Sequence, residues 1–450
     1  MHTIYRLKAP KEGASLPDYF SHSLLTKVER CPLQWWLLHS KYEGLEGRYP
    51  QAIHAATVSG KVVHATMEAF AHALRLSGNV SPWSSEYLRT RQSFPLRQTV
   101  LKLREKELAS ITGNPRVNAT VVRNGVSVDK CINAFKRLVT LVYSSDRIKA
   151  KSSRDAGNDV AKYKSRVISN DVNFLPTNPP AVPKPDTDNP HTLIKGLSKT
   201  NWIQLGQVPC PASLPEVSLR ISKPPLLGTI DLIKTGEEGD TIVEFKTGEP
   251  HPEHKSQSKL YAVLWWHQTR RPIRERLLLY TDYDPESLGG LNTTQLEEEK
   301  GSLQQRISVV QADFSLNPPP ARPSPENCQL CPVRQLCTEY WHAPETSEYR
   351  WTVEPIRQIS AGEDITEWRD IELGLTNAVI TEHGFTVDLN IPVSTNTHTF
   401  PVRLVCNVPA KFNAGLKVRP HKVKLLSVGL KREGTAIRVI HSSLSEMFWS

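Results

Sequence analysis

The sequence predicts an α/β domain over residues 1–350 followed by an all-β domain over residues 351–450. Helical and strand-like patterns are interleaved through the first part of the chain. After Trp351 the residues alternate between apolar and polar in short stretches separated by Gly and Pro. A chain of 450 residues is also long enough for about two or three domains.

Helical patterns dominate the N-terminal third. Ser21 is a suitable cap for a helix that runs to Tyr42, and further helical patterns cover 59–76 and 128–143. Between about 145 and 199 the chain is first polar and then Pro-rich, without periodicity. Such a composition predicts a flexible insertion rather than a packed element.

Strand patterns begin at Pro215. EVSLRI and LLGTIDLIK are each typical of a strand, and GEEGD predicts a hairpin turn between LLGTIDLIK and a third strand, TIVEFKTG. A helix over 255–267, a strand over 277–280 and a helix over 295–311 follow.

Three charged residues lie near the ends of the predicted hairpin. Glu244 and Lys246 are two apart and project to the same side of their strand, whereas Phe245 points into the core. Antiparallel pairing would bring Asp231 beside Glu244, and two adjacent carboxylates repel unless a cation such as Mg²⁺ or Mn²⁺ lies between them. Such a metal would activate water for hydrolysis, with Lys246 orienting the nucleophile or stabilising developing negative charge. The alternative is an exposed edge strand with solvated charges.

These residues resemble a known family. GTID at 228–231, EFKTG at 244–248 and the pair Gln257 and Tyr261 resemble the PD-(D/E)XK nuclease superfamily in its RecB-like branch, and GKVVH at 60–64 resembles the GxxxH motif of that branch. The resemblance implies a restriction-endonuclease-like core, in which helices flank a mixed central sheet. It also implies a site in which His64, Asp231 and Glu244 are metal ligands, Lys246 is the catalytic lysine, and Gln257 and Tyr261 support the site and contact DNA.

Three cysteines are clustered as CQLCPVRQLC, at Cys328, Cys331 and Cys337. This spacing allows several thiolates to meet at one centre, which requires a fourth ligand. Resemblance to AddB-type nuclease domains implies that Cys31, in ERCPLQWW, is that ligand and that the four cysteines bind a [4Fe-4S] cluster. A structural Zn²⁺ held by the same thiolates is the alternative that spacing alone leaves open.

The last hundred residues contain five strand-like stretches, which suit a small OB-like barrel. A β-sandwich used only for assembly is the alternative. The net charge of +10 favours a polyanionic partner. A basic face of this domain is expected to bind nucleic acid through Lys417, Arg419, Lys422, Lys424, Lys431 and Arg432.

Together these features predict a metal-dependent DNA nuclease that hydrolyses phosphodiester bonds in single-stranded or frayed DNA. Genome defence, recombination, repair and CRISPR-linked processing are the expected settings. No Walker A motif occurs, so unwinding would require a helicase or a defence-system protein as partner. The alternatives are a catalytically idle nucleic-acid-binding scaffold of such a complex and an RNA-processing nuclease.

The sequence also carries an expectation about location. The N-terminus lacks the apolar region of a signal peptide, and no apolar run approaches the roughly 20 residues that span a bilayer. These observations predict a cytoplasmic protein without a membrane partner.

Overall fold

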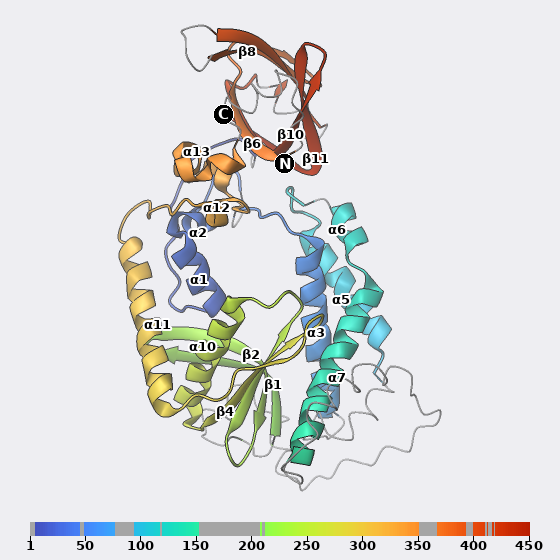
Figure 1. Ribbon diagram of the computed structural model, residues 1–450, viewed down its shortest axis with the longest axis vertical. Coiled ribbons are helices and arrows are strands. Elements are labelled where there is room, and N and C mark those ends of the chain that lie inside the picture. Colours follow the sequence, from blue (N-terminus) through green and yellow to red (C-terminus); the bar gives the residue numbers. More distant parts are fainter. Residues whose placement is uncertain are drawn as a thin grey trace.

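A computed structural model describes residues 5–45, 49–76, 94–117, 119–152, 208, 212–350, 367–392, 399–409, 412, 416–417 and 419–450. This part of the chain contains a five-stranded sheet with helices on both faces and a six-stranded C-terminal sheet (Figure 1). The insertion predicted from about 145 begins later, because residues 145–152 are helical, and its remainder from 153 to 199 lies outside the described residues. None of the described helices is long and apolar enough to span a bilayer.

The N-terminal helices confirm most of the predicted pattern. Ser21 caps the first helix, because its hydroxyl accepts a hydrogen bond of 3.2 Å from the Leu24 N–H. The single helix predicted as far as Tyr42 is wrong: Cys31 is extended, and a second helix starts at Pro32, where the missing N–H costs nothing. The described helices of this region are α1 (His22–Arg30), α2 (Pro32–His39), α3 (Ala55–Leu76), α5 (Leu96–Ile111), α6 (Ala119–Gly125) and α7 (Val128–Ser152).

The central sheet confirms the predicted hairpin and settles the position of its charged strand. Its strands, in spatial order, are β1 (Ala212–Ser222), β2 (Pro225–Thr235), β3 (Asp240–Lys246), β4 (Ile273–Tyr280) and β5 (Glu286–Ser287). β3 pairs antiparallel with β2 and parallel with β4. It is therefore a central strand, which excludes the exposed-edge alternative. The parallel connection is made by α10 (Pro252–Thr269).

The two faces of this sheet are covered by different helices, which enclose two apolar cores. Val243 and Phe245 of β3 pack with α3, α5 and α7, whereas Ile242 packs with α1, α10 and α11 (Thr293–Asp313). This alternation follows from the two-residue period of a strand. It places the side chains of Glu244 and Lys246 on the α10 side of β3.

The C-terminal region forms one mixed sheet. Its spatial order is β6 (Arg369–Gly374), β10 (Lys422–Glu433), β11 (Ala436–Trp449), β9 (Thr399–Asn407), β8 (Gly384–Pro392) and β7 (Val379–Thr381). β11 and β9 are parallel, and the other neighbours are antiparallel. Among the described residues the end strands β6 and β7 do not pair, so the sheet does not close there and the predicted OB-like barrel is not confirmed.

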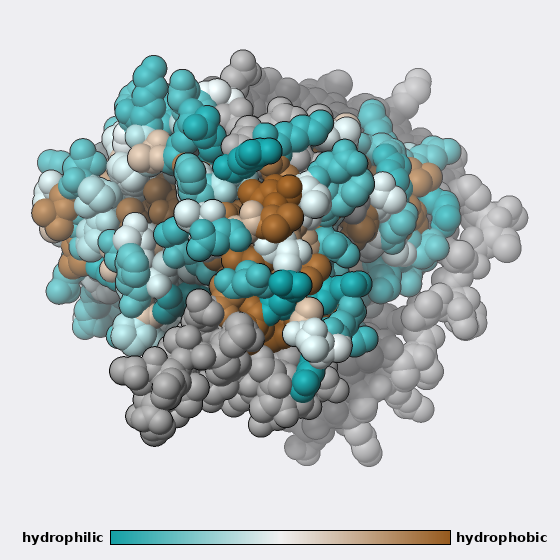
Figure 2. Space-filling model, turned by 90° about the horizontal axis from the view of Figure 1, so that it is seen from above, coloured by the Kyte–Doolittle hydropathy of each residue, from teal (hydrophilic) through white to brown (hydrophobic). Residues whose placement is uncertain are grey.

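The C-terminal sheet lies at one end of the molecule and is packed against the cysteine-bearing segment (Figure 1). Cys328 at the end of α12 (Pro325–Cys328) and Tyr340 of α13 (Thr338–His342) belong to the same apolar core as the strands. The N-terminal segment joins them, since the Leu7 N–H donates to the Trp449 carbonyl over 2.7 Å. Seen from this end, hydrophobic residues gather near the centre of a largely hydrophilic surface (Figure 2).

Candidate active site

The acid, acid, lysine set lies where the β2–β3 hairpin ladder ends. The last paired residues are Leu232 and Val243, so Asp231 and Glu244 are the next to face each other. Both side chains are buried, at 8% and 4% exposure. Asp231 is fixed to the backbone of β3, because its Oδ2 accepts a hydrogen bond of 2.7 Å from the Phe245 N–H. The folding of the hairpin thus brings the two predicted carboxylates together.

A chain of hydrogen bonds connects β3 to α10. The Lys246 ammonium donates to Glu244 Oε1 over 2.8 Å and to Gln257 Oε1 over 2.7 Å. The Gln257 amide nitrogen in turn donates to the Tyr261 hydroxyl over 2.7 Å. Gln257 and Tyr261 are one helical turn apart and share a face of α10, as their spacing predicts.

Two glycines permit the close packing that this arrangement requires. A Cβ at Gly228 would lie 2.7 Å from the ring of Tyr261, so the absence of a side chain on β2 makes room for that ring. A Cβ at Gly60 would lie 2.9 Å from the Thr247 hydroxyl oxygen, directly after Lys246. The glycine of the GKVVH motif therefore lets α3 approach the end of β3.

α3 brings His64 to the carboxylates. Its Nδ1 lies 3.6 Å from Asp231 Oδ1. Burial lowers the pKa of His64, but the hydrogen bond and the negative charge of Asp231 outweigh this effect and raise the pKa above its ordinary value. Glu68, one turn further along the helix, is exposed.

Lys246 and His64 neutralise the acidic pair only in part. Burial and the negative charge of Asp231 raise the pKa of the Glu244 carboxyl, and Lys246 only partly offsets this. Glu244 Oε2 is buried and has no hydrogen-bond partner among the described residues. Buried oxygens of this kind suit a hard divalent cation, and the imidazole of His64 adds a further donor. Within the described residues, however, no three His, Cys, Asp or Glu side chains form a ready-made metal-binding group.

The sequence alone did not reveal the role of two neighbouring histidines. His251 and His254 form the N-terminal capping box of α10, in which each ring accepts a backbone hydrogen bond of 3.3 Å. Burial and the nearby Lys246 lower the pKa of His254 to about 4, so its ring is neutral at neutral pH. Pro252 at the first helical position was the feature of the sequence that could have indicated the start of α10. Glu216 on β1 is half-buried.

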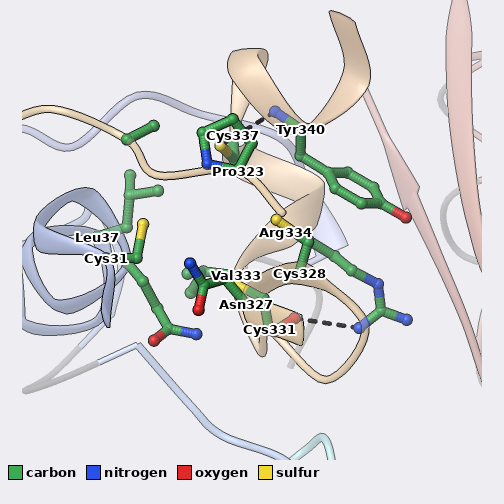
Figure 3. Close-up of a pocket in the computed structure, with 12 residues that line it drawn as sticks. Cys31, Leu37, Pro323, Asn327, Cys328, Cys331, Val333, Arg334, Cys337 and Tyr340 are labelled. Atoms are coloured by element: carbon green, nitrogen blue, oxygen red, sulfur yellow. Dashed lines mark hydrogen bonds between the residues drawn. The ribbon is translucent and has the colours of Figure 1, made fainter. Parts of the chain in front are cut away.

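The four predicted cysteines are brought together at a second place. Cys31, Cys328, Cys331 and Cys337 line one pocket (Figure 3). Cys31 lies at the junction of α1 and α2, and the other three belong to the segment that follows α11. Burial raises the pKa of the thiols of Cys331 and Cys337, to about 11 and about 12. Four thiol donors around one space fit a thiophilic metal or cluster by their chemistry, although they form no ready-made group as they stand.

The predicted basic residues of the C-terminal region differ in their surroundings. Lys424 is half-buried, donates to the Gln335 carbonyl over 3.0 Å and lies over the Trp341 ring. It therefore contacts the cysteine segment rather than an open surface. Lys422 is exposed and pairs with Glu372 at 3.4 Å. The side chains exposed at the surface also include Lys417, Arg419, Lys431 and Arg432.

Comparison with known proteins finds a family match for the region that contains the first site. Residues 203–338 match the family model described as the PD-(D/E)XK nuclease superfamily. The matched region contains Asp231, Glu244, Lys246 and the α10 pair, but begins after His64 and Cys31. No curated protein matches the chain. The region that holds the buried acid, acid, lysine set is thus similar to the PD-(D/E)XK nuclease superfamily, and this similarity suggests nuclease activity.

Proposed function

We propose that the protein is a metal-dependent nuclease that hydrolyses phosphodiester bonds in DNA, with single-stranded or frayed ends as its preferred substrate. The observation that supports this proposal most strongly is the fixed position of Lys246. Its ammonium is held by Glu244 and Gln257 beside a buried acidic pair. Such an arrangement of charges is costly to fold, and catalysis gives a reason for it.

The chain supplies both the metal donors and a prepared cation. Asp231, Glu244 and His64 would hold Mg²⁺ or Mn²⁺, which when bound polarises a phosphate and lowers the pKa of water. The Phe245 N–H fixes the orientation of the Asp231 carboxylate. An ammonium group has three donors, and two of those on Lys246 are engaged by protein oxygens. No acceptor for the third lies within the described part of the chain, and this donor would bind a phosphate oxygen or orient the attacking water.

The α10 residues keep that lysine in place. Gln257 accepts from Lys246 and donates to Tyr261, so its amide orientation is defined from both ends. Preorganised donors of this kind stabilise developing charge without reorganisation during the reaction. Gln257 and Tyr261 therefore act through Lys246, and contact of either residue with DNA is a separate prediction.

The direct test is cleavage of end-labelled single-stranded DNA, double-stranded DNA and matched RNA in Mg²⁺, Mn²⁺ or EDTA. Lys246→Ala is compared with Lys259→Ala, a control on α10 whose side chain is 46% exposed. We expect metal-dependent DNA cutting that is abolished only by Lys246→Ala. Cutting of RNA alone would favour the RNA-processing alternative. Binding of nucleic acid without cleavage in every condition would favour the alternative of a catalytically idle scaffold.

We also infer that the four-cysteine pocket holds a [4Fe-4S] cluster, with Zn²⁺ as the alternative. All four thiols line one pocket, although they come from segments about 300 residues apart, and soft thiolates suit either group. Metal and sulfide analysis of anaerobically purified protein separates the two. Iron and sulfide in equal amounts would support the cluster, and zinc alone would support the structural ion. Protein that contains neither iron nor zinc would refute both.

The exposed cations of the C-terminal sheet support a nucleic-acid-binding role for this region. Joint replacement of Lys417, Arg419, Lys431 and Arg432 should weaken DNA binding and reduce its salt dependence, since each phosphate contact adds about 0.7 to the slope for single strands. An unchanged slope would remove these residues from the proposed interface. A helicase or defence-system protein as partner remains a prediction of the sequence.

A further inference from the structure

A buried arginine connects the cysteine pocket to the first strand of the C-terminal sheet. Arg334 lies between Cys331 and Cys337, and its side chain is 12% exposed. One end of its guanidinium donates to the Cys331 carbonyl over 3.0 Å (Figure 3). The other end donates to both oxygens of Asp370 on β6, over 2.5 and 3.3 Å. Asp370 thus holds the backbone of a pocket cysteine through one intervening side chain.

A second buried arginine, Arg116, connects the next backbone carbonyl of the cysteine segment, that of Pro332, to the C-terminal sheet. Arg116 precedes α6, and its side chain is 1% exposed. It donates to the Pro332 carbonyl over 2.5 Å and to both oxygens of Glu446 on β11, over 2.8 and 2.6 Å. Two consecutive carbonyls of the cysteine segment, at 331 and 332, are therefore each bound by an arginine whose charge is neutralised by a carboxylate of the C-terminal sheet.

The position of Asp370 is defined by hydrogen bonds from several donors, of which Arg334 is one. Its Oδ1 accepts from the Ser427 N–H over 2.8 Å, and its Oδ2 accepts from the Tyr340 hydroxyl over 2.9 Å. Asp370 itself is 3% exposed. A buried, fully bonded carboxylate loses most of these interactions if its charge is removed, which distinguishes it from a surface ion pair.

The opposite side of the pocket is held by different residues. The Asn327 amide donates to the Arg30 carbonyl over 3.1 Å, next to Cys31, and Arg322 donates to the Glu29 carbonyl. Neither contact involves the C-terminal sheet. The pocket is therefore assembled from two sides, one tied to α1 and the other to the C-terminal sheet.

We propose that Asp370 and Glu446 are positioning residues for the cysteine pocket, acting through Arg334 and Arg116, so that metal retention in the pocket and docking of the C-terminal sheet are coupled. This inference rests on the proposed metal or cluster in that pocket. Outer partners that fix the orientation of metal ligands commonly govern metal affinity. Coupling of two equilibria is reciprocal, so a loaded pocket must in turn stabilise the docked sheet.

The test compares Asp370→Asn and Glu446→Gln with Asp388→Asn. Asp388 pairs with Arg403 on the same sheet, but both side chains are more than 60% exposed. Iron, sulfide and zinc per chain are measured before and after challenge with a chelator, and circular dichroism checks the fold. We expect Asp370→Asn and Glu446→Gln to retain metal about 10- to 100-fold more weakly, with the control unchanged. Wild-type retention by Glu446→Gln, the milder change, would overturn the proposal even if Asp370→Asn fails to fold.

Hydrogen exchange tests the reverse direction. Removing the metal from wild-type protein should speed exchange in peptides from β6 and β10 while leaving β8 unchanged. Equal exchange in loaded and stripped protein would refute the coupling. Both measurements are independent of DNA cleavage, so an inactive nuclease does not obscure them. A wild-type protein without metal at its cysteines would instead refute the proposed cofactor.

Discussion

Glu244→Gln is expected to stabilise the metal-free protein increasingly as the pH rises, while abolishing cleavage. Glu244 is 4% exposed, and burial together with the charge of Asp231 raises the pKa of its carboxyl to about 8. In the unfolded chain a glutamate has a pKa of about 4.3. Between these values the folded protein binds a proton that the unfolded chain has released, so stability falls as the pH rises through this window.

The magnitude follows from the linkage relation. One fully differing proton changes the free energy of unfolding by on the order of 1.4 kcal/mol for each pH unit. Glutamine does not titrate, so this slope is absent from the variant. Across the window from about pH 5 to 8 the variant should therefore gain a few kcal/mol relative to the wild type. The pH profile is more informative than any single value, because loss of the Lys246 partner shifts the whole curve of the variant.

The assay is thermal unfolding in EDTA across this pH range, with Glu297→Gln on α11 as the exposed control. We expect the difference in Tm between Glu244→Gln and wild type to increase with pH, and the control to follow the wild type. Added Mg²⁺ should raise the Tm of the wild type and have little effect on Glu244→Gln, since metal binding favours the folded state that holds the ligand. Parallel pH profiles of wild type and Glu244→Gln in EDTA would refute the account of the buried acidic pair.

Three further changes test the surroundings of the site. Tyr261→Phe removes the hydroxyl that orients Gln257, and should lower kcat about tenfold with KM for DNA unchanged; a change in KM alone would indicate DNA contact instead. Gly228→Ala places a Cβ 2.7 Å from that ring and should cost about 1–3 kcal/mol of stability, measured by denaturant unfolding. Asp240→Asn removes the charge of a buried carboxylate that accepts hydrogen bonds from Trp265 and Arg271, and should cost about 1–3 kcal/mol without altering Mg²⁺ affinity, as titration of the folded variant would show.

Several features of the site could be predicted because they depend on local spacing. Residues two apart on a strand share a side, so the spacing of Glu244 and Lys246 predicted that both project to one side of β3, where the structure shows them in contact. Residues four apart on a helix share a face, which applies equally to Gln257 and Tyr261. The hairpin turn at 236–240 then fixed which residue of β2 faces Glu244. Pro32 was a sequence sign that the predicted helix is divided at Cys31. Helical spacing of apolar residues on both sides of Pro32 led instead to the prediction of one continuous helix.

The sequence by itself determined which residue types are present at each site and which face of its own strand or helix each of them occupies. The tertiary structure decided which distant segments meet. It brought His64 to Asp231, placed Cys31 in one pocket with Cys328, Cys331 and Cys337, and joined Arg116 to Glu446 across 330 residues. Periodicity reports only which side of its own element a residue occupies. Contacts between elements depend on how the apolar faces of the whole chain pack. Packing also buries some charged groups, and these are stable only when they are paired with a group of opposite charge.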